Sequence, residues 1–285
     1  MWFYKHLETL EEPLPKQKVW CQHPEKLTVL FIEGDRKPLT KFNLWNIAHV
    51  YGGTDVGLHI ICSPRNLKDM KEWTKDWTNV TITWNALQSL DEYNTFSCSP
   101  EMYTRFTSTH LLLMQWDSYI FRPLDEHLFE YDYIGAPWRE AVSSEGTWTV
   151  VEDIGDTPHA RVGNGGFSLR KVLSCYQCCI ENVNKSKKLD DVFFSFDTTL
   201  HIPTKEIAYE FAVETKLRDA EPPKSPVGIH KIWDYPFFFV YLSFSLFLLL
   251  LFYIFFLYFF FLIYSFFYSL LHFLSLFLFS FSTFL

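Results

Sequence analysis

The chain changes chemical character abruptly after Asp234. All 25 Lys and Arg and all 33 Asp and Glu lie in residues 1–234, whereas residues 235–285 carry no such charge and hold 18 of the 30 Phe. The charge content of the first part is typical of a globular domain, and its length is sufficient to bury a large core. The sequence therefore predicts an N-terminal extension at 1–25, one folded domain at 26–234 and an apolar tail at 235–285.

The tail has two interpretations. A membrane-spanning helix needs about 20 apolar residues, so the tail is long enough for one tilted helix or a two-helix hairpin. Residues 237–285 would then make a membrane one of the partners. The Phe, Leu, Ser, Tyr and Ile residues of the tail are also all encoded by T-rich codons, so it equally resembles translated pyrimidine-rich noncoding sequence, an artefact of the gene model.

The expected location of the domain depends on the tail. The first residues of the chain lack the apolar core and the small-residue cleavage site of a secretory signal. Lys224 and Lys231 precede the tail, and the positive-inside tendency would keep them in the cytosol. We therefore expect a membrane-associated protein with a cytosolic domain if the tail is genuine, and a cytoplasmic protein otherwise.

Net charge and cysteine spacing argue against two kinds of site. The net charge is −8 and no stripe of Lys and Arg occurs, so nucleic acid is not expected as a partner. A bound divalent cation would reconcile this acidity with a phosphate-bearing ligand. The Cys175-x-x-Cys178-Cys179 motif has no second Cys or His pair at zinc-finger spacing, which favours free thiols on a helix over a structural zinc site.

Strands and helices alternate along the domain. Apolar runs of strand length at 27–33, 57–62 and 80–84 are separated by helical patterns that extend to about Tyr51 and over 67–77. This alternation predicts an α/β fold with a mostly parallel sheet flanked by helices. Further along, the patterns predict a strand at 110–115, an extended segment at 119–123 and helices at 171–183 and 206–216.

Polar residues that follow strands are candidate site residues, because ligands of parallel sheets bind outside the carboxyl ends of the strands. Asp117 follows the most apolar strand of the domain. The octet at 163–170, Gly-Asn-Gly-Gly-Phe-Ser-Leu-Arg, joins a glycine-rich turn to a strand-like run. Gly165 and Gly166 can take positive φ and let the main chain approach a ligand, while Asn164 tolerates the same conformations and adds an amide. The octet is either a binding loop or an ordinary turn before a strand.

Asp190 and Asp191 open a predicted helix and also have two interpretations. Acidic side chains cap the free N–H groups at the start of a helix and suit the helix dipole. Two carboxylates in a cleft would instead suit proton abstraction, because one carboxylate raises the pKa of the other.

Several stretches, taken in order, resemble the domain-of-unknown-function family 5672, a group of glycosyltransferase-like domains. The matching stretches are Gln-Trp-Asp at 115–117, 131–138, 162–170, Asp-Asp-Val at 190–192, Ala208 with 211–214, and Gly-Ile-His at 228–230. The resemblance covers most of 26–234 and implies a GT-A-like fold that binds a nucleotide-diphosphosugar.

The resemblance also implies a metal site. Asp117 occupies the place of the acidic motif with which GT-A enzymes bind Mn²⁺ or Mg²⁺, although only one acid stands there. His230 resembles the late histidine that completes the metal shell in several such enzymes; otherwise it is an ordinary core or surface histidine. The cation would neutralise the charge that develops on the departing diphosphate.

Further roles follow from the same resemblance. Asp191 stands where inverting GT-A families carry the base that activates the acceptor, with Asp190 as its neighbour. Gly165 and Gly166 would approach the donor or acceptor sugar. Trp138 would stack on a sugar face, unless it is a core residue.

The leading hypothesis is a metal-dependent glycosyltransferase that takes a nucleotide-diphosphosugar as donor and a glycan or another hydroxyl compound as acceptor. The alternative is a catalytically inactive, membrane-anchored sugar-binding or scaffold domain. A glycosidase with a carboxylate pair is a third class, supported only by Asp190 and Asp191.

Overall fold

The structure is a computed structural model that describes residues 18–85, 87, 89–138, 162–183, 189–214 and 225–231. Residue contacts divide the chain into 1–234 and 235–285, and every described residue belongs to the first part. No helix in the described part is long and apolar enough to cross a membrane. The predicted apolar tail and most of the predicted N-terminal extension lie outside the described residues.

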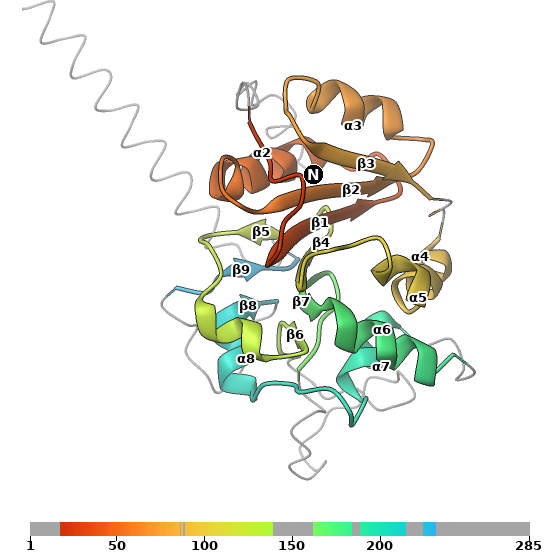
Figure 1. Ribbon diagram of the computed structural model, residues 1–285, viewed down its shortest axis with the longest axis vertical. Helices are drawn as coiled ribbons and strands as arrows, with labels where there is room; N and C mark the ends of the chain where they lie inside the picture. The colour runs from red at the N-terminus through yellow and green to blue at the C-terminus, as the bar shows by residue number, and fades with distance from the viewer. Residues whose placement is uncertain are drawn as a thin grey trace, which may run out of the picture. The chain divides into compact units, whose positions relative to one another are not determined.

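A six-stranded sheet forms the centre of the domain, with the order β3-β2-β1-β4-β7-β6 (Figure 1). The strands are β1 (Leu27–Glu33), β2 (Gly57–Cys62), β3 (Val80–Trp84), β4 (His110–Met114), β6 (Tyr133–Gly135) and β7 (Phe167–Lys171). Neighbours among β1 to β4 pair in parallel, whereas β7 runs antiparallel to both β4 and β6. Only β7 is therefore reversed within this sheet, and the sheet is mostly parallel as predicted.

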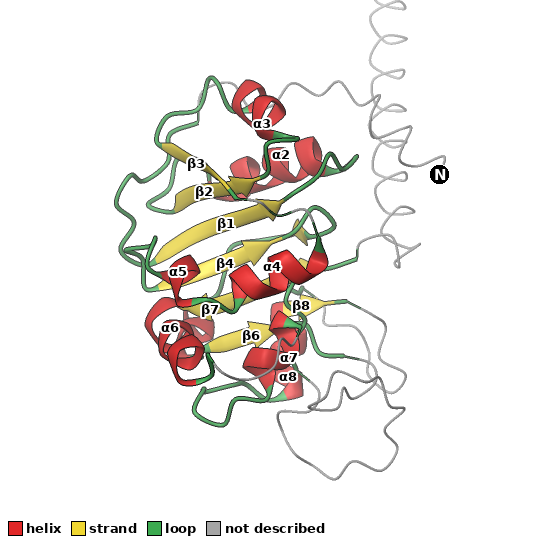
Figure 2. Ribbon diagram, turned by 90° about the vertical axis from the view of Figure 1, so that its right-hand side faces the viewer, coloured by secondary structure: helices red, strands yellow, loops and turns green. Residues whose placement is uncertain are grey.

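Burial explains why the central strands have continuous apolar sequences. Every residue of β1, β2 and β4 is buried, as expected for strands that are covered on both faces. The edge strand β3 is more exposed. Helices α2 (Thr40–Tyr51) and α4 (Leu90–Ser97) lie on opposite sides of the sheet (Figures 1 and 2). The predicted fold class, an α/β domain whose sheet is flanked by helices, is confirmed.

The remaining helices surround this framework. They are α3 (Leu67–Trp73), α5 (Pro100–Tyr103), a 3-10 helix (Glu126–Glu130), α6 (Val172–Glu181), α7 (Asp190–Ser195) and α8 (Lys205–Phe211). Helix α6 carries Cys175, Cys178 and Cys179 as buried free thiols, as the sequence predicted.

A small three-stranded sheet lies beyond the carboxyl end of β4. Its strands are β5 (Tyr119–Ile120), β8 (Ala212–Val213) and β9 (Gly228–Ile229), in the order β5-β9-β8. Strand β9 is antiparallel to β5 and parallel to β8. Asn43 of α2 fixes the segment before β5, since its Nδ2 donates to the carbonyl groups of Trp116 at 2.8 Å and Ser118 at 2.9 Å. These bonds hold the main chain on both sides of Asp117.

Local contacts shorten two of the predicted helices. The helix predicted at 67–77 ends at Trp73, where both the N–H and the hydroxyl of Thr74 bond to a carbonyl of the last turn. The helix predicted at 206–216 ends at Phe211, because the next two residues pair with β9 as strand β8. Both predictions of the C-terminal boundary are therefore wrong.

Candidate functional site

A cleft of about 280 Å³ opens at the carboxyl ends of β1 and β4. Its walls are formed by residues 32–35 and Lys37 at and after the end of β1, Arg65 after β2, residues 115–116 after β4, and Leu87, Ser89, Leu90 and Tyr93 around the start of α4. Ligands of open α/β sheets bind at this edge. The cleft combines two cationic side chains, Lys37 and Arg65, with two acidic ones, Glu33 and Asp35, and with apolar walls, so it offers contacts for polar groups and for an apolar ring.

A buried histidine joins two carboxylates next to residues 115–116 of the cleft wall. His230 Nε2 lies 3.3 Å from Asp117 Oδ1, and His230 Nδ1 lies 3.4 Å from Glu214 Oε1. All three side chains are less than one-tenth exposed. The small sheet brings them together, because Asp117 precedes β5, Glu214 follows β8 and His230 follows β9. The structure therefore places the two predicted metal ligands side by side, with Glu214 against the other ring nitrogen of His230.

The charges in this cluster stabilise one another. Burial alone lowers the pKa of His230, but the carboxylates of Asp117 and Glu214 outweigh this effect and raise it to about 9. Burial raises the pKa of Glu214, but the interactions of Glu214 with His230 and Lys231 hold that pKa below its ordinary value. At neutral pH the cluster therefore contains a histidinium between Asp117 and Glu214.

Close approach of the main chain explains the glycines at 165 and 166. A Cβ on Gly166 would lie 2.1 Å from His230 Nε2 and 2.7 Å from Gln115 Oε1, and a Cβ on Gly165 would lie 2.6 Å from Asp190 Oδ1. Neither glycine has positive φ, so that expectation is wrong. The main chain of the octet packs directly against the candidate site residues, and any side chain at these two positions would displace them.

Hydrogen bonds tie the octet to the end of β4. The Oδ1 of Asn164 accepts the N–H of Gly166 at 2.9 Å, and Asn164 itself is buried. The carbonyl of Gly166 accepts the N–H of Gln115 and the hydroxyl of Ser118, each at 2.9 Å. Asn164 therefore stabilises the glycine-rich turn. Through the carbonyl of Gly166, this turn fixes the main chain on both sides of Asp117.

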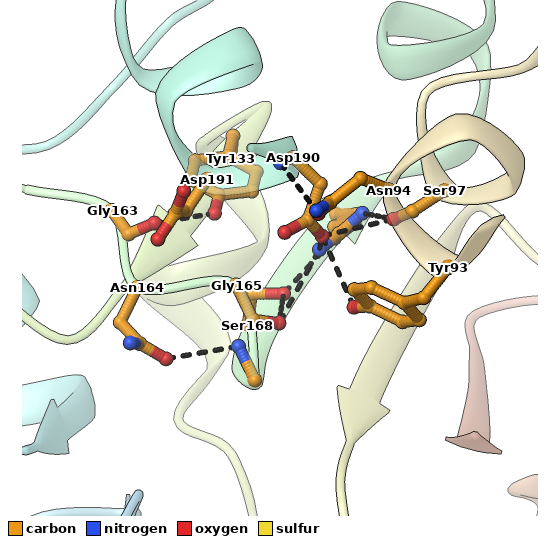
Figure 3. Close-up of polar contacts among 12 residues, drawn as sticks. Tyr93, Asn94, Ser97, Tyr133, Gly163, Asn164, Gly165, Ser168, Asp190 and Asp191 are labelled. Atoms are coloured by element: carbon orange, nitrogen blue, oxygen red, sulfur yellow. Dashed lines mark hydrogen bonds and ion pairs between the residues drawn. The ribbon is translucent and has the colours of Figure 1, made fainter. Parts of the chain in front are cut away.

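Asp190 belongs to a buried hydrogen-bond network around Arg170 (Figure 3). The Arg170 side chain is fully buried and donates to Asp190 Oδ2 at 2.5 Å. The hydroxyls of Tyr93, at 3.1 Å, and Ser97, at 2.9 Å, donate to the same oxygen. Arg170 also donates to Ser97, Tyr103, Ser168 and the carbonyl of Gly165. This network holds the start of α7 against β7 and α4, and we assign Asp190 a positioning role on this basis.

Asp191 lies in a different environment from Asp190. Figure 3 shows its carboxylate on the side of Gly163, away from the bonds that hold Asp190. The side chain is half-buried, and its Oδ1 accepts the N–H of Val192 at 2.7 Å. Burial raises the pKa of Asp191 to about 7, with further contributions from the carboxylates of Asp190 and Glu214. A carboxyl with this pKa can accept a proton near neutral pH.

Trp138 is a core residue in this structure. It is 2% exposed and packs against Val192 of α7. A ring that stacks on a sugar must present one face to the ligand. The ring of Trp138 is too deeply buried to present a face. The structure therefore favours the core explanation over the stacking role.

Asp117 and His230 could hold a divalent cation shared with a substrate only after His230 gives up its proton, because both nitrogens of a histidinium are donors. Asp117 Oδ1 and both ring nitrogens of His230 are buried and make no hydrogen bond. Carboxylate oxygens suit Mn²⁺ and Mg²⁺, and neutral imidazole is a common metal ligand. The described residues contain no group of three or more His, Cys, Asp or Glu that could hold a metal, so a cation here would need further ligands. Substrate phosphates commonly supply such ligands to Mg²⁺ sites with one or two carboxylates.

Glu33 is a site residue that the sequence patterns did not single out. It ends β1, lines the cleft, and accepts the N–H of Asp35 on its Oε1 at 2.8 Å. Burial raises the pKa of Glu33 to about 7, and the charge of Asp117 adds to this effect. The rule that selected Asp117, a polar residue at the end of an apolar strand, also selects Glu33.

Comparison with known proteins gives a family and several similar folds. A family model described as "Protein of unknown function (DUF5672)" matches residues 76–230. Among solved structures, the chain is similar to 4-diphosphocytidyl-2C-methyl-D-erythritolsynthase from Anaerococcus prevotii, with 8% identity and a TM-score of 0.41 over 63% of this chain and 87% of that one. Sequence comparison finds no matching curated protein.

Two further solved structures are similar to the chain. One is an active-site mutant of LgtC, with 10% identity and a TM-score of 0.47 over 71% of this chain and 86% of that one. The other is the mannosyltransferase PcManGT from Pyrobaculum calidifontis in complex with GDP-Man and Mn²⁺, with 13% identity and a TM-score of 0.40 over 71% of this chain and 60% of that one.

Proposed function

The chain belongs to the DUF5672 family of proteins of unknown function, and we propose that it is a metal-dependent glycosyltransferase. It would transfer a sugar from a nucleotide-diphosphosugar to a hydroxyl group of a glycan or another acceptor. The observation that carries the proposal is the buried pair of Asp117 and His230 beside a cleft at the carboxyl edge of the sheet.

The cleft has the groups that a nucleoside diphosphate requires. Lys37 and Arg65 provide positive charge for the phosphates, and Leu87, Leu90 and Trp116 provide apolar walls for the base. Asp117 and His230 would hold Mn²⁺ or Mg²⁺ together with the diphosphate. Such a cation supplies electrostatic stabilisation of the negative charge on the leaving diphosphate.

The transfer would proceed by a single displacement. The acceptor oxygen forms a bond with the anomeric carbon, and the bond between that carbon and the diphosphate oxygen breaks. Asp191 takes the proton of the acceptor hydroxyl, because its pKa of about 7 suits a general base. Arg170 and Asp190 act on this step only by holding α7, and with it Asp191, in place. This route inverts the configuration at the anomeric carbon.

Calorimetric titration of the full-length chain tests the proposal. UDP-sugars or GDP-sugars should bind in the presence of Mn²⁺, and nucleoside diphosphate should be released when a hydroxyl acceptor is added. Asp117→Ala should weaken the Mn²⁺-dependent binding by about 10-fold or more, the range seen when metal sites lose supporting groups. Asp55→Ala is the matched control, since Asp55 is exposed and precedes β2 at the opposite edge of the sheet.

Two results would contradict the proposal. Glycan binding that needs neither nucleotide nor metal would support the alternative, a catalytically inactive sugar-binding or scaffold domain. Hydrolysis of a glycoside without any nucleotide would instead indicate a glycosidase.

A further inference from the structure

Strand β3, at the edge of the main sheet, has no neighbour on its outer side. It pairs only with β2 (Figure 1), and no other described residue bonds to its main-chain groups. Natural proteins protect such an edge from other chains with charged residues, prolines or bulges. The sequence of β3, Val-Thr-Ile-Thr-Trp, contains neither charge nor proline, its pairing with β2 has no bulge, and its last residue, Trp84, is 63% exposed. This edge is therefore open to pairing with another strand.

The bonds between β3 and β2 show which main-chain groups of β3 are open. The N–H of Asn85, directly after β3, donates to the carbonyl of Cys62 in β2. The N–H and C=O groups of successive residues in a strand point to alternate sides. Val80, Ile82 and Trp84 lie at odd spacings from Asn85, so they direct their N–H and C=O groups away from β2. Every second residue of β3 therefore offers one donor and one acceptor to a further strand.

A second copy of β3, laid antiparallel to the first, matches these open groups. When Ile82 lies opposite Ile82 of the second copy, Val80 lies opposite Trp84. In the same register Thr81 lies opposite Thr83. Outward residues then oppose outward residues, so the open N–H and C=O groups of both strands bond to one another. A slip of one residue would oppose threonines to apolar side chains, and a slip of two would take Val80 or Trp84 out of the pairing.

The side chains agree with this register. Each end of the paired strands places the ring of Trp84 opposite the β-branched side chain of Val80, and the positions between them pair threonine with threonine. Both kinds of cross-strand pair stabilise antiparallel sheets. Because β3 carries no charge, no like charges oppose each other. We propose that β3 pairs with β3 of a second copy of this chain, antiparallel about a two-fold axis at Ile82, so that two main sheets join into one. This inference does not depend on the proposed function.

The length of the strand sets the expected strength of this contact. Five residues from each copy bury less surface than the roughly 800 Å² per partner of a standard stable interface. The contact is nevertheless specific, because a two-fold pairing of identical edges closes on itself and leaves no open edge at β3. We therefore expect a reversible dimer whose Kd lies in the micromolar range.

Disulfide cross-linking of the full-length chain tests the register. The chain is kept in detergent, because residues 235–285 carry no charge. The double variant Thr81→Cys with Thr83→Cys places cysteine opposite cysteine at pairs whose Cα atoms lie about 4.5 Å apart, a spacing that a disulfide spans. After oxidation with diamide it should run mostly as a covalent dimer on a non-reducing gel. Each single variant places cysteine opposite threonine, and should give no more dimer than the native chain with its own six cysteines.

Sedimentation velocity over a range of concentrations tests the dimer without cross-linking. The native chain should change from monomer to dimer as its concentration rises. Trp84→Lys should raise the Kd about fivefold or more, because a symmetric dimer loses the aromatic pair at both ends of the strands. Leu173→Lys is the matched control, since Leu173 of α6 is 64% exposed and lies away from β3; it should leave the Kd unchanged. Near-ultraviolet circular dichroism shows whether each variant keeps the native fold.

Three results would overturn the inference. The first is a native chain that stays monomeric up to about 0.2 mM, well above a micromolar Kd; if it then binds a peptide with the sequence of β3, the edge takes an extended peptide of another protein and not a second copy. The second is a dimer that Trp84→Lys leaves unchanged, which would place the contact elsewhere in the chain. The third is equal cross-linking of the double and single variants, which would exclude the register about Ile82.

Discussion

Replacing Asp190 by alanine should cost about 3–5 kcal/mol of unfolding free energy, because it leaves a buried charge without its partner. The Arg170 side chain is fully buried and the Asp190 side chain is 7% exposed. Truncation removes the only carboxylate that the structure pairs with Arg170 within the described residues. It also removes the acceptor of the hydroxyls of Tyr93 and Ser97. A domain with a total stability of about 5–15 kcal/mol would lose a large part of it.

Urea denaturation followed by tryptophan fluorescence measures this loss. The matched control is Asp91→Ala, an exposed aspartate in the first turn of α4, which should change the unfolding free energy by less than about 0.5 kcal/mol. Arg170→Met alone should also destabilise the domain, because it removes the charge that the Asp190 carboxylate faces. The double variant Arg170→Met with Asp190→Ala should cost less than the sum of the two single changes, by about 0.5–3 kcal/mol.

Two results would contradict the interpretation of Arg170 and Asp190 as a buried ion pair. One is a loss below about 1 kcal/mol for Asp190→Ala, the range of an exposed ion pair. The other is strict additivity in the double variant. Either result would mean that the start of α7 is held by packing alone, and that Asp190 has no positioning role.

Three further changes probe the proposed site. Gly166→Ala should weaken Mn²⁺-dependent nucleotide binding by about 10-fold or more in calorimetry, because its Cβ would lie 2.1 Å from His230 Nε2 and disturb a metal ligand; unchanged binding would contradict the close approach. The contribution of His230 to the free energy of unfolding should be fully present below its ordinary pKa of 6.5 and should be lost as the pH rises through about 9. Urea midpoints measured from pH 6 to 10 should show this loss in the native chain and not in His230→Gln. Asp191→Asn should lower the rate of sugar transfer by about 10²–10⁴-fold with little change in nucleotide affinity, and a variant that still transfers sugar at the native rate would exclude Asp191 as the base.

The main sheet was predictable because its signals are local. The strands β1, β2 and β4 are buried at every residue, so each is a continuous apolar run in the sequence. Ser89 and Glu92 form a capping box at the start of α4, and this sequence signal would have predicted the helix that the periodicity did not. The reversed direction of β7 has no such local signal, because it depends on pairing with β4.

The roles of the two adjacent aspartates could not be separated from the sequence. Capping and proton abstraction both explain an Asp-Asp pair at the start of a helix. The structure distinguishes them through one distant residue, Arg170, which reaches Asp190 and not Asp191. The position of the arginine in the octet offered no indication of this pairing, since it lies 20 residues from Asp190 in the chain.

The cluster around His230 is encoded still less locally. Each strand of the small sheet is only two residues long, which is too short for any periodic pattern. Yet this sheet alone aligns the residues next to its strands, so that Asp117, Glu214 and His230 meet in the fold. Only the resemblance to a family connected Asp117 with His230, and nothing in the sequence patterns gave Glu214 a role. A short strand in this domain therefore matters less for the residues it contains than for the charged residue that precedes or follows it.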